Sequence, residues 1–209
     1  MKKLHKIARI YQLYQKLSEK YRDKKFWSKW CKRRKTNQDK EEIALGAILT
    51  QRTKWENVEI SLENLRKAKV LSIGGIYLIA KKDIRKLETL IKPSGFYKQK
   101  AKRLFYFSKF IVENYNSLKN FFHQDLKIAR EMLLKLYGIG RETADTILLY
   151  AGQKPIFVID EYTKRFVKKY NISDNLSYEH LRNLFEENLP RDIKIYQDFH
   201  AMIVLDGKR

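Results

Sequence analysis

The residues best suited to chemistry stand in the stretch "LYGIGRET", where two glycines precede a short charged segment. Gly138 can adopt the left-handed conformation that ends a helix, and Gly140 lets another backbone come close. The amides that open the next helix, near Thr143, would then point outward and hold an anion such as a phosphate without a basic side chain. An ordinary helical hairpin with a glycine cap shows the same pattern, so both interpretations stay open here.

A second candidate is Asp160 in "VIDEYTKR", which stands directly before a helical run. Aspartate is a favoured N-cap residue, and Thr163 lies at the third position after it, so helix capping is one interpretation. The amides at a helix start also keep a carboxylate ionised where burial would favour its protonation. A capping role and a chemical role are therefore compatible at Asp160.

Further candidates are a glutamine, an aromatic residue and a group of cations. Gln51 follows an apolar stretch, where an unpaired amide would cost about 2 kcal/mol or more if it were simply buried. Phe96 stands in a turn, "SGFY". Both residues also have a purely structural interpretation, Gln51 as a helix cap and Phe96 as part of the core. Cations crowd the start of the next helix, where they oppose its dipole, and a negative ligand would remove this conflict: Lys98, Lys100, Lys102 and Arg103.

The net charge indicates the class of partner. The chain of 209 residues has 45 Lys and Arg against 24 Asp and Glu, a net charge of +21. Such an excess repels itself in a compact fold unless a polyanion compensates it, which favours nucleic acid. A merely lysine-rich surface, as in thermophile proteins, is the alternative.

Cysteine and histidine usage restricts the possible metal sites. The single cysteine, Cys31, excludes an internal disulfide framework and any metal site built only from cysteines. The histidines lack metal-ligand spacing and are predicted to be structural or solvated: His5, His123, His180 and His200. The first residues lack the apolar core of a signal peptide, and no stretch reaches the roughly 18 apolar residues of a membrane span. We therefore expect a soluble, cytoplasmic protein.

Helical periodicity runs through most of the chain. Residues 4–17 show the apolar spacing of an amphipathic helix, and residues 43–51 are apolar on nearly every side, as in a buried helix. The polar stretch 32–42 predicts a basic loop between them. A long helix is predicted over residues 101–115.

A helix-capping residue, a turn and one short apolar run complete the pattern. Asp83 is predicted to cap a helix that Pro93 and Gly95 bring to an end. Only residues 154–159 have the composition of a strand, and they are few enough to form a buried connector instead. The chain is therefore predicted to be all-α, with about ten helices.

The longer pattern resembles a known family. "LKLYGIGRETADTILLYAG" followed by "VIDEYTKR" resembles the helix-hairpin-helix and downstream aspartate of the endonuclease III superfamily of DNA base-excision glycosylases. "ALGAILTQRTKW", "KPSGFYKQKAKRL" and "FHAMIVLDGK" extend the resemblance in family order over most of residues 43–208, and the first two look closest to the 3-methyladenine DNA glycosylase III branch. The resemblance implies a two-lobed all-α fold with the DNA cleft between the lobes.

Lobe boundaries follow from the same resemblance. One lobe comprises residues 1–45 and 151–209, and the inner lobe comprises residues 46–150, with the helix-hairpin-helix at 132–150. Amides of Gly138, Gly140 and Thr143 would hold phosphates beside the lesion. The resemblance also implies a structural monovalent cation bound by backbone carbonyls of Leu134, Leu136 and Ile139.

Roles for the remaining candidates are likewise implied by the resemblance. Gln51 would fill the space left by the flipped nucleotide, Phe96 would wedge between bases, and Lys98 and Lys100 would bind the DNA. Asp160 would assist departure of the base, by stabilising positive charge on the sugar or by activating water.

Glu142 distinguishes two classes of glycosylase. Bifunctional relatives carry a lysine at this point of the hairpin exit, whose amine attacks the sugar and forms a Schiff base. A carboxylate cannot form that adduct, the guanidinium of Arg141 is never deprotonated, and Lys164 lies a turn beyond Asp160. The sequence therefore favours a monofunctional enzyme that hydrolyses only the bond between base and sugar.

Aromatic residues bear on the substrate. A ring-alkylated base is cationic and leaves readily, and aromatic faces tolerate its charge through stacking and cation–π attraction. Trp55 matches an aromatic pocket position of the 3-methyladenine branch, whereas Trp27 and Trp30 lie where that branch has a tryptophan-proline segment that lacks its proline here. Core packing is the alternative for all three.

The resemblance also bears on cofactors and rival functions. Many relatives carry a four-cysteine iron-sulfur loop after the last motif, and this chain has one cysteine, so no cluster and no other cofactor is expected. The expected partner is double-stranded DNA with a damaged base, bound by a monomer without contact to a membrane. An endonuclease III-like glycosylase with lyase activity on oxidised bases, and a non-catalytic DNA-binding module, are the two alternatives.

Overall fold

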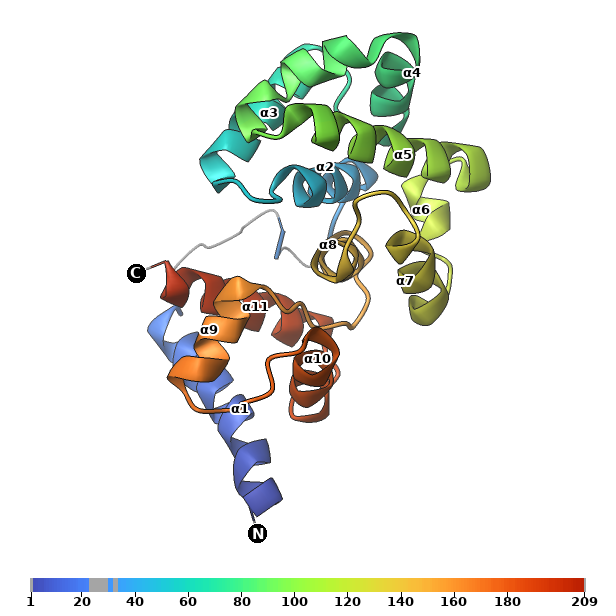
Figure 1. The fold of residues 1–209 in the computed structure, drawn as a ribbon. Helices are drawn as coiled ribbons and strands as arrows, with labels where there is room; N and C mark the ends of the chain where they lie inside the picture. Colours follow the sequence, from blue (N-terminus) through green and yellow to red (C-terminus); the bar gives the residue numbers. More distant parts are fainter. Residues whose placement is uncertain (1, 23–29, 32–33, 209) are drawn as a thin grey trace. The chain divides into compact units, whose positions relative to one another are not determined.

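In the computed structural model, residues 2–22, 30–31 and 34–208 are described, and regular structure among them is entirely helical. The chain divides into two compact units: unit 1 comprises Met1–Arg33 and Gln153–Arg209, and unit 2 comprises Arg34–Gly152. The helices in chain order (Figure 1) are α1 (Lys2–Lys20), α2 (Asn37–Leu49), α3 (Trp55–Lys67), α4 (Ile73–Leu90), the 3-10 helix η1 (Lys92–Ser94), α5 (Tyr97–Tyr115), α6 (Leu118–Phe121), α7 (Leu126–Leu134), α8 (Arg141–Thr146), the π-helix η2 (Ile147–Ala151), α9 (Glu161–Lys169), α10 (Tyr178–Glu187) and α11 (Ile193–Gly207). The predicted all-α class is confirmed.

Unit 2 is built around α2. Its residues Ile43–Leu49 are all buried, as their unbroken apolar run predicted, and α2 packs against α5 and η2. α4 and α5 pack along one another and cover a further side of the unit (Figure 1). The predicted loop at 32–42 is wrong beyond Thr36, because Thr36 and Asp39 form a capping box that starts α2 within the polar stretch.

The cap and the turn that were predicted in unit 2 are present. Asp83 interrupts α4 with a φ of −161° and a ψ of 99°, and its carboxylate accepts from the Arg85 amide at 3.0 Å, so it caps the second half of that helix. Pro93 lies in η1, and Gly95 has a φ of 69°, which leads the chain into α5. The turn formed by η1 and Gly95 thus determines where α5 begins.

Unit 1 joins the beginning of the chain to its last part. α1 and α9 both pack against α11, and an aromatic cluster forms its core around Phe157, Phe185 and Phe199. The nearly buried carboxylate of Asp206 in α11 accepts from Lys20 and from Lys169, the latter at 3.0 Å. One acidic side chain thus connects three helices.

Residues 154–159 form the buried connector that was one of the two interpretations of this stretch, and no strand occurs among the described residues. Ile156, Phe157, Val158 and Ile159 are buried, and the Phe157 amide donates to Glu186 at 2.9 Å. The unit boundary falls before α2, which belongs to unit 2 as one continuous helix, whereas the sequence analysis divided the lobes after residue 45. None of the described helices is long and apolar enough to cross a membrane.

Candidate functional site

The helical hairpin of unit 2 contains the left-handed glycine that the sequence predicted, at Gly138, whereas the space beside Gly140 is open. α7 ends at Leu134 and α8 begins at Arg141, with Gly140 as the N-cap residue, which has no side chain to cover the first amides of α8. Gly138 has a φ of 73°, and both glycines are exposed, while Ile139 between them is buried. The hairpin therefore presents backbone to solvent and anchors itself by one apolar side chain.

A buried ion pair holds the two helices of the hairpin together. Arg130 of α7 donates to both carboxylate oxygens of the fully buried Asp145 in α8, at 2.7 and 3.1 Å. Such a bidentate pair restricts orientation as well as distance. The chain then continues from α8 into a π-helix, a rare element that is frequent near functional sites.

Gln51 is bonded to the hairpin from the turn that follows α2. Its Nε2 donates to the Gly138 carbonyl at 3.1 Å and to the Thr143 hydroxyl at 2.8 Å, and its Oε1 accepts from the Arg103 guanidinium. A Cβ atom on Gly138 would come within 3.0 Å of the Arg103 side chain. Gln51, Arg103, Gly138 and Thr143 are thus brought together as one network, and the capping alternative for Gln51 does not describe these contacts.

The start of α5, the helix that carries Arg103, presents an exposed aromatic residue. Phe96 is the N-cap residue of α5, has a φ of 47° and is 56% exposed, so it is not a core phenylalanine. Lys98 is exposed in the first turn. On the next part of the surface Tyr106 of α5 and Tyr137 of the hairpin are 46% and 52% exposed, with ring centroids 5.7 Å apart. Exposed tyrosine rings therefore stand at the glycine hairpin, and α5 also presents Phe96 and Lys98 at its start.

Lys100 departs from its predicted role as a DNA contact. Its side chain is completely buried, and its ammonium donates to the carbonyls of Leu49 at 2.7 Å and Ser94 at 2.6 Å. Burial and, to a smaller extent, the nearby charge of Arg103 together lower the pKa of Lys100 to about 8. A phosphate cannot reach this ammonium, because protein carbonyls surround it.

In unit 1, Asp160 is the N-cap of α9. One carboxylate oxygen accepts from the amide and the hydroxyl of Thr163, at 2.7 and 2.9 Å, and the other lies 3.4 Å from His200 Nε2. The side chain is 13% exposed. Burial favours the neutral acid, but His200 and Thr163 stabilise the anion more strongly, so the pKa of Asp160 is lowered and the carboxylate is ionised at neutral pH.

His200 and Arg103, like Lys100, have partners that the sequence did not indicate. The sequence analysis treated His200 as structural or solvated, and it sits 40 positions after Asp160, so no local spacing connects them. The only available signal was that His200 lies in the matching stretch "FHAMIVLDGK". Arg103 was grouped with surface cations, whereas its guanidinium is bonded to Gln51.

The other predicted residues take different positions. Glu142 is exposed in the first turn of α8, where a carboxylate is favoured by the helix dipole. Trp55 begins α3 in unit 2 and is partly exposed, Trp30 is partly exposed in unit 1, and Trp27 lies outside the described residues. No structural observation distinguishes their predicted pocket roles.

The predicted cation site involves backbone only. Leu134, Leu136 and Ile139 stand at the end of α7 and in the hairpin turn, and the Leu136 carbonyl accepts from the Ile139 amide at 3.1 Å. Carbonyl oxygens in such a turn suit a hard cation. Their binding of a monovalent ion stays a prediction.

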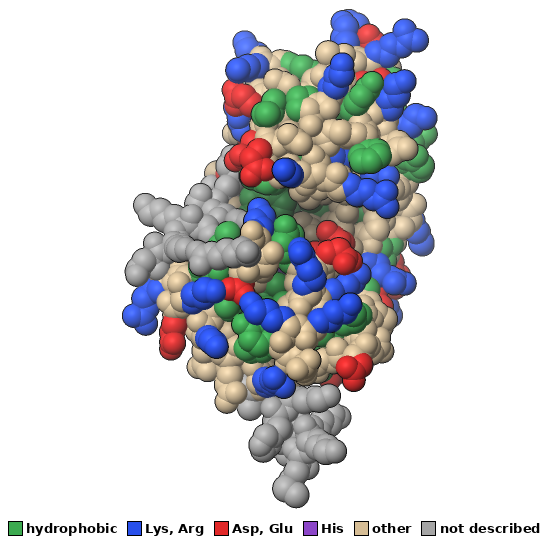
Figure 2. Space-filling model, turned by 60° about the vertical axis from the view of Figure 1, so that its left-hand side comes forward, with side chains coloured by type: hydrophobic (Ala, Val, Ile, Leu, Met, Phe, Trp, Pro, Cys, Tyr) green, Lys and Arg blue, Asp and Glu red, His purple; other side chains and the backbone are tan. Residues whose placement is uncertain are grey.

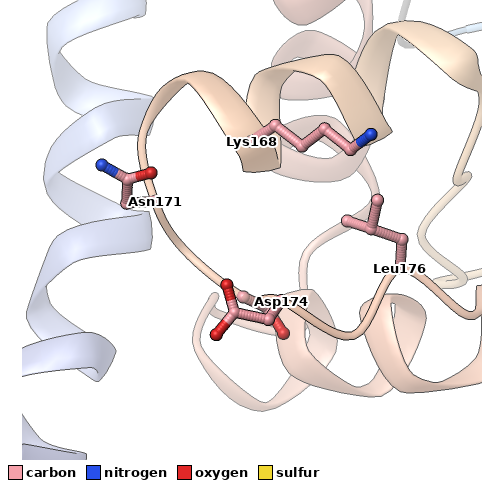
Figure 3. Close-up of a pocket in the computed structure, with 5 residues that line it drawn as sticks. Lys168, Asn171, Asp174 and Leu176 are labelled. Carbon is pink, nitrogen blue, oxygen red and sulfur yellow. The ribbon is translucent and has the colours of Figure 1, made fainter.

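A pocket of about 200 Å³ lies elsewhere in unit 1 (Figure 3). It is lined at the C-terminal end of α9 and in the loop that follows, by Lys168, Asn171, Ser173, Asp174 and Leu176. Asp160 stands at the opposite end of the same helix. The pocket thus contains none of the predicted site residues.

Lys and Arg side chains are widely spread over the face shown in Figure 2, which agrees with the net charge of +21.

Comparison with known proteins supplies the family context. Residues 45–191 match the family described as HhH-GPD superfamily base excision DNA repair protein. The Methanocaldococcus jannaschii protein MJ1434, whose name places it among DNA repair glycosylases, is 40% identical over 99% of this chain and 90% of its own length. Endonuclease III of Thermotoga maritima is 29% identical over 72% of this chain and 66% of its own length.

Solved structures agree with this grouping. A crystal structure of Helicobacter pylori 3-methyladenine DNA glycosylase (MagIII) bound to 1,N6-ethenoadenine matches with a TM-score of 0.83 and 32% identity, over 95% of this chain and 97% of the other. A non-covalent endonuclease III–DNA complex matches with a TM-score of 0.72 and 16% identity, over 95% of this chain and 84% of the other, and so shows likeness of fold alone.

Proposed function

Since the chain belongs to the HhH-GPD superfamily of base excision DNA repair proteins, we propose that it is a monofunctional DNA glycosylase that releases a damaged, N-alkylated purine. The observation that carries this proposal is Asp160, a nearly buried carboxylate that His200 and Thr163 keep ionised. A buried anion is costly unless it has a use or a full set of partners, and perturbed carboxylates concentrate at functional sites.

DNA binding would fall to the hairpin and the start of α5. The amides of Gly138, Gly140 and Thr143 would bind phosphates, and the exposed Lys98 would add a cation. The target base must leave the duplex before its glycosidic bond can be reached. Phe96, exposed at the N-cap of α5, would wedge between bases, and Gln51 would occupy the vacated space.

In the reaction, the bond between sugar C1′ and the base nitrogen breaks, and its electron pair leaves with the base. Positive charge develops on the sugar, and the anionic Asp160 would stabilise it or accept a proton from the attacking water. The water oxygen bonds to C1′, which leaves an abasic site. A purine alkylated on a ring nitrogen is already cationic and departs as a neutral base, so no general acid is needed.

Absence of lyase chemistry is supported by the residues near the hairpin exit. Glu142 stands where bifunctional relatives have the Schiff-base lysine, and a carboxylate cannot form that adduct. Lys164, the nearest lysine after Asp160, donates to Glu161 at 2.6 Å in an ion pair within α9. Water therefore remains the nucleophile of this proposal.

The alkylated purine is supported by similarity, and by an aromatic residue. The protein of known structure that is 32% identical is named a 3-methyladenine DNA glycosylase and holds 1,N6-ethenoadenine. Trp55, partly exposed at the start of α3, would contribute a π face that attracts a cationic base. The partner is double-stranded DNA containing such a lesion, and the enzyme would act as a monomer without a redox cofactor.

Base release from alkylated, oxidised and uracil-containing duplexes, measured in parallel, tests the proposal. Asp160→Asn should abolish release while DNA binding is retained, and Asp174→Asn, which changes an exposed carboxylate of the same unit, should leave release intact. Borohydride should trap no covalent adduct with lesion DNA. A trapped adduct with release of oxidised bases would instead support an endonuclease III-like glycosylase and lyase, and binding without release of any base would support a non-catalytic module.

A further inference from the structure

Lys100 is an unusual lysine, because its charge is enclosed within unit 2. The side chain is 0% exposed, and its pKa of about 8 leaves the ammonium protonated at pH 7. Removing a charged amine from water is unfavourable unless strong hydrogen bonds replace the lost hydration. The two carbonyls that do so, Leu49 at 2.7 Å and Ser94 at 2.6 Å, belong to different segments of the chain.

Both carbonyls stand at the ends of helical segments. Leu49 is the last residue of α2, and Ser94 is the last residue of η1. Terminal carbonyls lack partners within their own helices and carry the negative end of the helix dipole, so a cation is favoured there. The Lys100 ammonium therefore connects the C-terminal end of α2 directly to the end of η1.

The residues that follow these ends are the two that the proposed function places inside the duplex. Gln51 comes two positions after Leu49, and Phe96 comes two positions after Ser94. Phe96 is also the N-cap of α5, the helix that carries Lys100. One turn later on the same helix, Arg103 binds the Gln51 side chain. The first turns of α5 thus contact both segments.

We propose that Lys100 is a positioning residue that ties the Gln51 turn to the Phe96 turn, so that both residues enter the DNA as one rigid unit. This inference rests on the proposed function, because it assigns to Lys100 the step in which the damaged nucleotide is extruded. Lys100 contacts neither DNA nor the reacting atoms. Its effect passes through Gln51 and Phe96, whose spacing must match the gap left by one nucleotide.

The variant Lys100→Met keeps the length of the side chain and removes the ammonium. Nucleotide extrusion should slow by about ten-fold, the effect of losing roughly one charge-assisted hydrogen bond in that step. The rate is measured in stopped flow from the fluorescence of 2-aminopurine placed beside the lesion. Affinity for undamaged duplex should change by less than about two-fold, because the hairpin amides are untouched. Lys102→Met is the matched control, because Lys102 is an exposed neighbour on the same helix. This variant should extrude the nucleotide at the wild-type rate, and any change should appear in its affinity for undamaged duplex.

Two further measurements separate positioning from a general loss of stability. A lesion in an unpaired bulge needs little extrusion, so base release by Lys100→Met should approach the wild-type rate on that substrate. In a Gln51→Ala, Phe96→Ala background, Lys100→Met should slow extrusion no further, because the residues through which it acts are gone. If Lys100→Met does not fold, Lys100→Gln, whose amide still donates one hydrogen bond, serves in the same assays.

The outcomes distinguish this inference from the proposed function. If the wild-type protein releases the base and Lys100→Met extrudes it at the normal rate, the positioning role is wrong and the glycosylase assignment stands. An equal loss on paired and unpaired lesions would show that Lys100 serves stability only. If the wild-type protein neither releases a base nor opens the duplex, both proposals fail.

Discussion

Replacing Gly138 by alanine should destabilise the hairpin by two separable effects. With a φ of 73°, Gly138 has a backbone conformation that costs an L residue about 1–2 kcal/mol. The new Cβ would also overlap the Arg103 side chain, which must move and give up its hydrogen bond to Gln51. A charge-assisted hydrogen bond is worth about 1.5–3 kcal/mol, and the partial exposure of Arg103 favours the lower value. The sum is a loss of about 3 kcal/mol.

Urea denaturation of the purified protein measures this loss, and DNA affinity can be followed on the same preparations. Gly140→Ala is the control: its φ is −88° and a Cβ there would meet nothing within 4 Å, so stability should stay within about 1 kcal/mol of the wild type. In an Arg103→Ala background the overlap disappears, and Gly138→Ala should cost only the backbone strain of about 1–2 kcal/mol. Equal costs in the two backgrounds, or no cost in either, would refute the reasoning.

The remaining predictions concern charge. Burial would raise the pKa of Asp206, but its two lysine partners outweigh burial and lower it, so Asp206 stabilises unit 1 above the unfolded value near 3.9 and loses this effect as pH falls below it. Asp206→Asn should therefore cost about 1–2 kcal/mol in urea denaturation at pH 7, and this cost should shrink as the pH is lowered below about 3.9. The lowered pKa of Asp160 predicts that this residue does not limit base release until the pH falls below about 3.9, and a rate profile with an Asp160 step near pH 6 would contradict it. DNA affinity should fall steeply with salt, and Lys98→Ala should reduce the log-log slope by about 0.9, whereas an unchanged slope would exclude a phosphate contact there.

Local features of the sequence predicted the local structure well. The glycine hairpin, the cap at Asp160 and the buried run Ile43–Leu49 each depend on residues that are neighbours along the chain. The same holds for the cap at Asp83, while the capping box at Thr36 was overlooked because the charged residues around it resembled a loop.

Long-range contacts were not predictable in the same way. Lys100 was predicted to bind DNA as one of a cluster of cations, and only the converging carbonyls of Leu49 and Ser94 show that it is enclosed. His200 approaches Asp160 because α11 packs on α9, which no spacing in the sequence encodes. Sequence patterns thus indicated candidate residues, and the fold was needed to show which partners several of them contact.

Unit 1 is built from two separate segments of the chain, which affects how the protein folds during its synthesis on the ribosome. Unit 2 is one continuous segment, Arg34–Gly152, and can fold as soon as it has emerged, since domains generally fold as units during synthesis. α1 emerges before unit 2, yet its buried residues Ile10, Leu13 and Leu17 belong to a helix that packs against α11, which is made after unit 2. Nascent chains therefore expose this apolar stripe until α11 has emerged, and α1 is the segment on which chaperones would be expected to act.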